Sequence, residues 1–178
     1  MRRNNGGFTL IELIVVIVIL GILAVTAAPK FIDLQSDARL ATLNGMKAAI
    51  NSAVSLTYGK SLVLGKEKAD EGSITINGSP VTVCYGYPCA AASKIQQVLD
   101  IGVFDPCSGN STSGNSTSAR DWCYTGGGDS ESSIKIYVAN GYSSGSKCYV
   151  EYTQPDASGK APTVTLPTDE HGKIDVEC

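Results

Sequence analysis

The sequence predicts an α+β fold in which a long N-terminal helix packs, by its C-terminal half, on an antiparallel β-sheet. Two patterns support this fold class. No basic residue occurs between Arg3 and Lys30, and apolar residues then recur at helical spacing as far as Tyr58. The second half of the chain alternates apolar and polar residues in short runs, which is typical of strands. At 178 residues, the chain fits one domain or one domain with an appendage.

The composition excludes several classes of function. The net charge is −3 and no basic cluster is present, so we expect no nucleic acid as a base-specific partner. The single histidine, His171, lies in a polar turn, and no glycine-rich phosphate loop follows a predicted strand. We therefore expect no enzymatic activity, no cofactor and no metal site. The segment 126–131, which includes Asp129, has carboxylates of the kind that bind calcium, but such a segment is more often a solvated turn.

The most apolar segment of the chain is residues 8–28, which read FTLIELIVVIVILGILAVTAA. As a helix they would extend ~31 Å, about the thickness of the hydrocarbon core of a bilayer. Arg2 and Arg3 precede the segment, so the positive-inside rule keeps the N-terminus cytoplasmic and sends the rest of the chain across the membrane. Glu12 is the only acid in the segment. A carboxylate inside a membrane helix is costly, so we expect Glu12 to be functional.

A secretory signal peptide is the alternative interpretation of this segment, and it would make the chain a secreted soluble binding protein. The start is basic, an apolar run follows, and Val25-Thr26-Ala27 resembles a small-residue cleavage site before Ala28. Two features disfavour a signal peptide. The apolar run is longer than a usual signal core, and it carries Glu12, a charge that a disposable leader does not need.

The residues around the start of the apolar segment read Gly6-Gly7-Phe8-Thr9-Leu10-Ile11-Glu12 and resemble the processing site of type IV pilins and related pseudopilins. This resemblance implies that a prepilin peptidase cleaves between Gly7 and Phe8, removes the leader 1–7 and methylates the new N-terminus at Phe8. The stretch 24–39, AVTAAPKFIDLQSDAR, is most similar to the MSHA (mannose-sensitive haemagglutinin) pilins. The resemblance covers the helical region well and the remainder only in its layout.

The same resemblance implies a function, a location and partners. The chain would be the structural major subunit of a type IV pilus that serves surface attachment and biofilm formation. It would begin as a single-pass precursor in the inner membrane, with its domain in the periplasm, and end in an extracellular homopolymeric filament. Its other partners would be the prepilin peptidase and the pilus assembly platform. A type II secretion pseudopilin is the near alternative, because it shares the N-terminal motif.

Cleavage would create a free amine at Phe8, one helical turn from Glu12. When such helices pack side by side, the Glu12 carboxylate of one subunit can meet the Phe8 amine of another, and only one axial offset brings the two charges together. The pair would therefore act as a check on register during assembly. The alternative is a glutamate whose carboxylate only reaches the bilayer surface.

Residues 29–58 are expected to continue the helix with an amphipathic pattern. Pro29 lacks an N–H group and would clash with the carbonyl of Val25, so the helix should kink or loosen there. Gly21 is a second weak point. In type IV pili the equivalent stretch unwinds on assembly, so Gly21 to Pro29 is the candidate here, with a static kink as the alternative. The core-facing positions share helical spacing and are Leu40, Leu43, Met46, Ile50, Ala53 and Val54.

The remainder, residues 59–178, is expected to be a disulfide-bonded globular β domain. A hairpin is predicted around residues 77–80 and a short helix over 90–99. Further strands are predicted over Ile134–Val138, Cys148–Tyr152, Thr163–Leu166 and Lys173–Val176.

Six cysteines lie between residues 84 and 178, and an even count beyond an export-type N-terminus indicates disulfides. Cys84 and Cys89 enclose turn-forming residues, which makes Cys84–Cys89 one expected pair. Cys107–Cys123 would close the polar loop 108–118, where Asn110 and Asn115 match a glycosylation acceptor but a plain flexible loop is favoured. Cys148–Cys178 remains, and a last pair of this kind occurs in many pilins.

Overall fold

The computed structural model describes residues 9–99, 105–107, 121–128, 131–139, 142–172 and 174–176, and for 27–35 it describes the backbone alone. The chain divides into two compact units, Met1–Ala38 and Arg39–Cys178. The α+β fold class is confirmed, since one long helix is combined with two β-sheets. This arrangement is consistent with the pilin fold.

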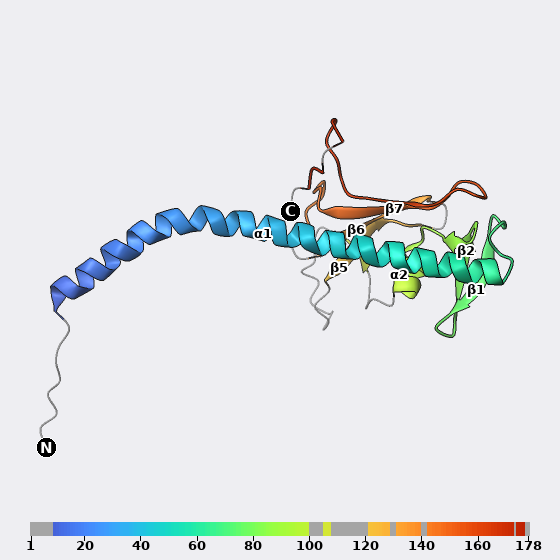
Figure 1. Ribbon diagram of the computed structural model, residues 1–178, viewed down its shortest axis with the longest axis horizontal. Helices are drawn as coiled ribbons and strands as arrows, with labels where there is room; N and C mark the ends of the chain where they lie inside the picture. The colour runs from blue at the N-terminus through green and yellow to red at the C-terminus, as the bar shows by residue number, and fades with distance from the viewer. Residues whose placement is uncertain are drawn as a thin grey trace, which may run out of the picture. The chain divides into compact units, whose positions relative to one another are not determined.

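The helix α1 extends from Leu10 to Val63 and contributes to both units (Figure 1). Its helical backbone continues through Gly21 and Pro29, so neither residue interrupts α1 in this state. Unwinding of that stretch on assembly stays a prediction.

The C-terminus of α1 lies at Val63, later than the expected end at residue 58. The helix is closed by a Schellman motif, in which Lys66 N–H donates to the Ser61 carbonyl at 2.8 Å and Gly65 N–H donates to the Leu62 carbonyl at 3.2 Å. Gly65 has φ +64°, the left-handed conformation that this motif needs and that glycine adopts without steric cost. The left-handed Gly65 and the two hydrogen bonds around it therefore mark the end of the helix.

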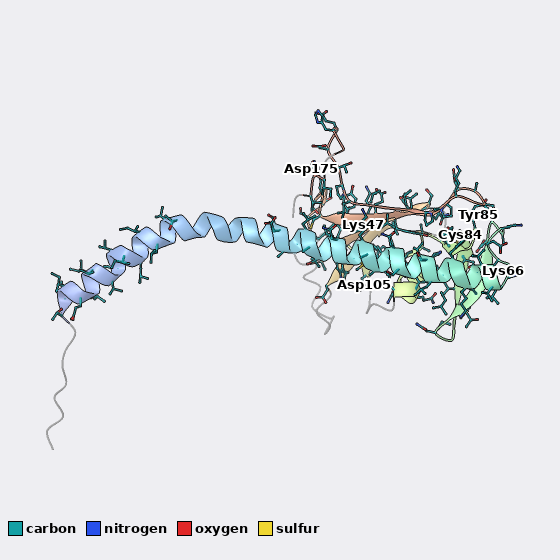
Figure 2. The ribbon with its side chains drawn as sticks, viewed as in Figure 1. Lys47, Lys66, Cys84, Tyr85, Asp105 and Asp175 are labelled. Carbon is teal, nitrogen blue, oxygen red and sulfur yellow. A yellow bond between two sulfur atoms is a disulfide. The ribbon has the colours of Figure 1, made fainter. Side chains whose placement is uncertain are left out.

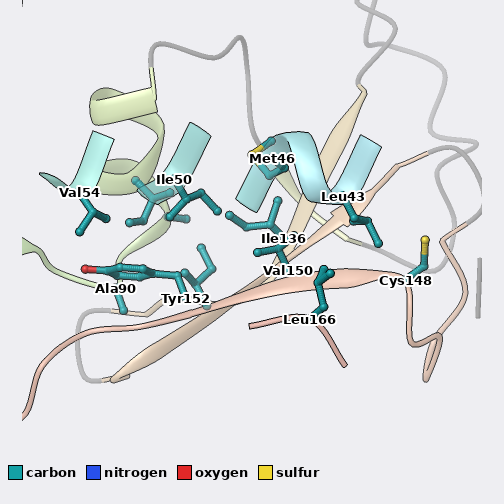
Figure 3. Close-up of a cluster of buried hydrophobic side chains, with 13 residues drawn as sticks. Leu43, Met46, Ile50, Val54, Ala90, Ile136, Cys148, Val150, Tyr152 and Leu166 are labelled. Atoms are coloured by element: carbon teal, nitrogen blue, oxygen red, sulfur yellow. The ribbon is translucent and has the colours of Figure 1, made fainter. Parts of the chain in front are cut away.

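The core of the second unit lies between α1 and the larger sheet (Figure 3). Leu43 and Ile50 of α1 are fully buried, and so are Ile136, Val150 and Tyr152 of the sheet. Burying one such apolar side chain contributes roughly 1.5–3 kcal/mol. All the core-facing positions expected on α1 are buried except Leu40, which is partly buried against the same cluster. The predicted periodicity of residues 40–54 is thus confirmed.

The strands form two sheets rather than the single antiparallel sheet that was expected. The smaller sheet has the order β1 (Gly72–Ile76), β2 (Ser79–Cys84), β3 (Tyr87–Pro88), and the helix α2 (Ala92–Leu99) contacts β2 and β3. The larger sheet has the order β4 (Asp105–Pro106), β5 (Trp122–Gly126), β6 (Ser133–Val138), β7 (Tyr149–Thr153), β8 (Thr163–Thr165). All pairs are antiparallel except β4 with β5, which is parallel.

One predicted strand is wrong. Of the run 173–176, the described residues 174–176 contribute a single bridge, between Ile174 and Thr168. The alternation of Ile174 and Val176 resembles a strand, but among the described residues no neighbouring strand continues the pairing beyond Thr168. Alternation alone does not make a strand where a pairing partner is missing.

Polar contacts join the two sheets. Tyr152 on β7 donates its hydroxyl to the carbonyl of Pro88 on β3 at 2.5 Å. The amide of Ala90, just after β3, donates to Gln154 Oε1 at 2.6 Å. The smaller sheet and the core of the larger one are therefore tied at the segment that also carries the first disulfide.

Candidate functional site

The N-terminal part of α1 is apolar on every side and uncovered. The described side chains from Leu10 to Val25 are all exposed, with 75% of Leu10, 69% of Ile11 and 77% of Val25 accessible. The side chains drawn along the blue end of α1 are almost wholly carbon (Figure 2). A helix that is apolar all round is one that is buried in a larger apolar environment, such as a helical core or a membrane. This segment is therefore the first candidate for an assembly surface.

Within the described part of the chain, no helix combines the length and the apolar character needed to cross a membrane. The predicted segment 8–28 includes Phe8 and the side chains of residues 27–28, which lie outside that part.

Glu12 and Thr9 form a capping box at the start of α1. Glu12 Oε2 accepts two hydrogen bonds from Thr9, one from the backbone N–H at 2.8 Å and one from the hydroxyl at 2.6 Å. In return, the Glu12 N–H donates to Thr9 Oγ1 at 3.4 Å. This is the reciprocal arrangement of a Thr-x-x-Glu capping box, in which the threonine is the N-cap and the glutamate is the third helical residue. The carboxylate therefore folds back toward the N-terminal end of its own helix.

The surroundings of Glu12 are otherwise apolar. Its side chain lines an open hollow of about 330 Å³ together with Ile11, Val15 and Val16. A charge in such surroundings needs hydrogen bonds or a counter-charge when water is excluded. The capping box was missed in the sequence analysis, although the spacing of Thr9 and Glu12 is its signature.

Two predicted site residues, Gly7 and Phe8, lie outside the described residues. Cleavage between them, methylation of Phe8 and the pairing of Phe8 with Glu12 therefore stay predictions. Gly21 lies within the exposed segment, and a Cβ added there would meet nothing within 4 Å. Packing inside one chain thus gives no reason for a glycine at position 21. The side chain of Pro29 is not described.

Two of the expected disulfides are present in the second unit. Cys84 bonds to Cys89 and Cys107 to Cys123, each with a Cα–Cα distance of 5.0 Å. Cys148 is also disulfide-bonded. Its expected partner, Cys178, lies outside the described residues, so that pair stays a prediction.

The Cys84–Cys89 bond closes an unusual turn between β2 and β3. Tyr85 has φ +51° and Gly86 has φ +85°, nearly the angles of Asn77 (+49°) and Gly78 (+81°) in the other hairpin of this sheet. Asn-Gly is the preferred pair for such a turn, whereas a tyrosine is disfavoured there. Tyr85 compensates through contacts with the segment after α1: its N–H donates to the Ala69 carbonyl at 2.9 Å. A hydrogen bond to Asp70 also raises the pKa of the Tyr85 phenol. Figure 2 labels Cys84 and Tyr85 on this hairpin.

The remaining candidates lie on exposed or undescribed segments. Asp129 and the loop 108–118, with Asn110 and Asn115, are outside the described residues. Among the described residues, no three His, Cys, Asp or Glu side chains are grouped as a metal site. The side chain of His171 is 80% exposed, and its backbone N–H donates to Asp169 Oδ1 at 2.9 Å.

Comparison with known proteins shows that the N-terminal segment matches a known motif. Residues 2–28 match the family model of the prokaryotic N-terminal methylation motif. The type IV narrow pilus major component PilA5 of Thermus thermophilus is 50% identical over 50 residues, which are 28% of this chain and 43% of the relative. The type IV major alpha-pilin of Moraxella bovis is 45% identical over 65 residues, 35% of this chain and 41% of the relative.

A component of a different system is also similar. The type II secretion system core protein G of Pseudomonas aeruginosa is 42% identical over 55 residues, 31% of this chain and 39% of the relative. The chain thus spans about two fifths of the length of the three relatives, and none of their names denotes an enzyme. No solved structure matches the chain.

Proposed function

We propose that this chain, which carries the N-terminal methylation motif and resembles type IV pilins over its helix, is the major structural subunit of an MSHA-like type IV pilus. The observation that carries the proposal is the uncovered apolar stretch of α1, which begins with one carboxylate at Glu12. Such a stretch has no role in the fold of a single chain. In a filament the stretch has a role, because the apolar stretches of neighbouring subunits bury one another.

The proposed course of assembly follows from this segment. The precursor is held in the inner membrane by residues 8–28, with residues 59–178 as the disulfide-bonded domain in the periplasm. A prepilin peptidase removes residues 1–7, and the assembly platform moves the mature subunit into the filament. Lipid and the filament core are similarly apolar, so close packing between helices is what favours the filament. The amphipathic part of α1, from residue 29, then presents the domain at the filament surface, where it serves attachment and biofilm formation.

Glu12 gives the assembled helices their register in this proposal. Its carboxylate and the amine of Phe8 from a second subunit neutralise each other in surroundings without water. A charge left alone there is strongly unfavourable. Subunits whose helices are offset by a turn lose the pair and are disfavoured.

A subunit of a type II secretion pseudopilus is the second candidate. It is favoured by the similarity to core protein G, which extends over 55 residues. The two candidates share cleavage, methylation and helix packing. They differ in the product, because a pilus is recovered from the cell surface by shearing, whereas a pseudopilus stays within the envelope.

The test is Glu12→Leu, with Thr26→Val as the matched control in the same apolar stretch. Removing the carboxylate should ease membrane insertion and leave cleavage at Gly7–Phe8 unaffected, since the leader is unchanged. Processed Glu12→Leu protein should accumulate in membranes and be missing from sheared surface fibres. The Thr26→Val variant should assemble normally. Normal amounts of sheared Glu12→Leu fibre would show that the charge pair does not direct assembly.

A further inference from the structure

We propose that Thr9 is the positioning residue for Glu12: it holds one carboxylate oxygen, Oε2, and leaves Oε1 for the amine of a second copy of this chain. This inference rests on the proposed function and deepens it, because it names a second residue on which subunit pairing depends. Neither the methylation motif nor the pilin relatives assign this role.

The hydrogen bonds divide the two oxygens of the Glu12 carboxylate. Oε2 accepts both the N–H and the hydroxyl of Thr9, at 2.8 and 2.6 Å. Among the described residues, Oε1 has no hydrogen-bond partner. A carboxylate has lone pairs for about four hydrogen bonds, so Oε1 retains the capacity to accept a charged donor. Oε2 therefore anchors the carboxylate to Thr9, and Oε1 is available to accept a hydrogen bond from a second subunit.

No other side chain nearby can replace Thr9. Between residues 9 and 26 the polar side chains are Thr9, Glu12 and Thr26 alone. The hydroxyl of Thr26 donates to the carbonyl of Leu23 at 3.0 Å, four turns further along the helix. In apolar surroundings, Thr9 is thus the only described side chain that can hydrogen-bond the carboxylate before another subunit arrives.

The anchoring also sets the direction of the Glu12 side chain. A free glutamate samples several rotamers and loses that freedom when it pairs. Thr9 holds the carboxylate at the N-terminal end of α1, which is the end where cleavage would create the amine of each copy. The Glu12 side chain therefore loses part of its rotamer freedom before the second subunit binds, so less entropy is lost when the pair forms. This is the general advantage of preorganisation.

If Thr9 only caps the helix, its hydroxyl is not needed for pairing between subunits. A glycine at position 9 distinguishes this capping role from the proposed positioning role. Glycine ranks close to threonine as an N-cap, so Thr9→Gly keeps the start of the helix and the backbone N–H, but removes the hydroxyl, which is one of the two donors to Oε2. Thr9→Ser keeps both. Thr26→Val removes a hydroxyl from the same apolar stretch without touching Glu12, and it is the matched control.

The experiment measures sheared fibre relative to the processed subunit in membranes, for the full chain in cells. Thr9→Gly should lower this ratio roughly tenfold, the effect of losing one hydrogen bond to a charged group. Thr9→Ser and Thr26→Val should stay close to the wild-type ratio. In detergent micelles, the amide proton of Thr9 in the wild-type chain should shift with the ionisation of Glu12, and Glu12→Gln should abolish that response.

The outcomes separate this inference from the proposed function. If Glu12→Gln loses its sheared fibre while Thr9→Gly keeps the wild-type ratio, the charge pair stands and the role of Thr9 is refuted. If Thr9→Gly leaves no processed subunit, Thr9 acts at the peptidase and the positioning role is again refuted. If Glu12→Gln assembles normally, the charge pair itself fails, and the positioning role fails with it.

Discussion

Tyr152 offers the sharpest test of how the domain is held together. Its side chain is fully buried on β7, and its hydroxyl donates to the carbonyl of Pro88 on the smaller sheet at 2.5 Å. Tyr152→Phe keeps the ring and its packing, but removes that hydrogen bond and leaves a buried carbonyl without its donor. The hydrogen bond is worth ~1 kcal/mol net, and an unsatisfied buried acceptor costs ~1–3 kcal/mol, so we expect a loss of ~2 kcal/mol in the free energy of unfolding.

The assay is thermal and urea unfolding of the oxidised fragment Arg39–Cys178, which is one compact unit. A loss of ~2 kcal/mol should lower the Tm by about 6 °C for a fragment of this size. The matched control is Tyr149→Phe on the same strand, whose ring is only half-buried and lies near the Lys135 ammonium, 4.9 Å from the ring centroid. Equal destabilisation by Tyr152→Phe and Tyr149→Phe would refute the role assigned to the buried hydrogen bond.

Three further outcomes are expected of the domain. Burial raises the pKa of Tyr152, so its phenol ionises more readily in the unfolded state; the free energy of unfolding should fall as the pH rises above ~10, and should fall less in Tyr152→Phe. Peptide mapping without reduction should link Cys148 to Cys178, and a link between Cys178 and Cys107 would overturn this pairing. In ultracentrifugation the fragment Arg39–Cys178 should be a monomer, because it lacks the apolar stretch whose packing is proposed to drive assembly; long filaments of this fragment would contradict the helix-core account.

The parts of the fold that the sequence predicts best are those with a strong local period. Apolar residues at helical spacing identified the buried face of α1, including Leu43 and Ile50. Alternation likewise identified β6 and β7, where Ile134, Ile136 and Val150 are buried. In these segments each side chain's burial follows from its own position in the period, without knowledge of the partner strand.

The strands that were missed are too short to show a period, and they are defined only by the strand with which they pair. Asp105–Pro106 is too short to show any period, and it is a strand only because it lies parallel to Cys123–Tyr124. Tyr87–Pro88 is a strand because the turn at Tyr85 returns the chain onto β2. The end of α1 is hard to predict for a different reason: Gly65 ends the helix, but Gly59 lies inside it, so a glycine alone does not mark the last turn.

For the candidate site, the sequence identified Glu12 but not its hydrogen-bond partner Thr9. A single carboxylate in an apolar run is conspicuous by composition alone. Its hydrogen bonds with Thr9 required either the structure or attention to the Thr-x-x-Glu spacing. The tie between the two sheets through Tyr152 and Pro88 had no local signal at all, because the two residues are 64 positions apart in the sequence.

The most direct test of the central claim is to identify the N-terminus of the mature protein. The protein would be recovered from sheared surface material and from the culture medium, and analysed by N-terminal sequencing and intact mass. The account predicts a chain from sheared fibres that begins at Phe8, lacks residues 1–7 and carries one methyl group on its α-amine. A soluble chain in the medium that begins at Ala28 would contradict the account, because residues 8–28 would then be a discarded signal peptide and no filament core would remain.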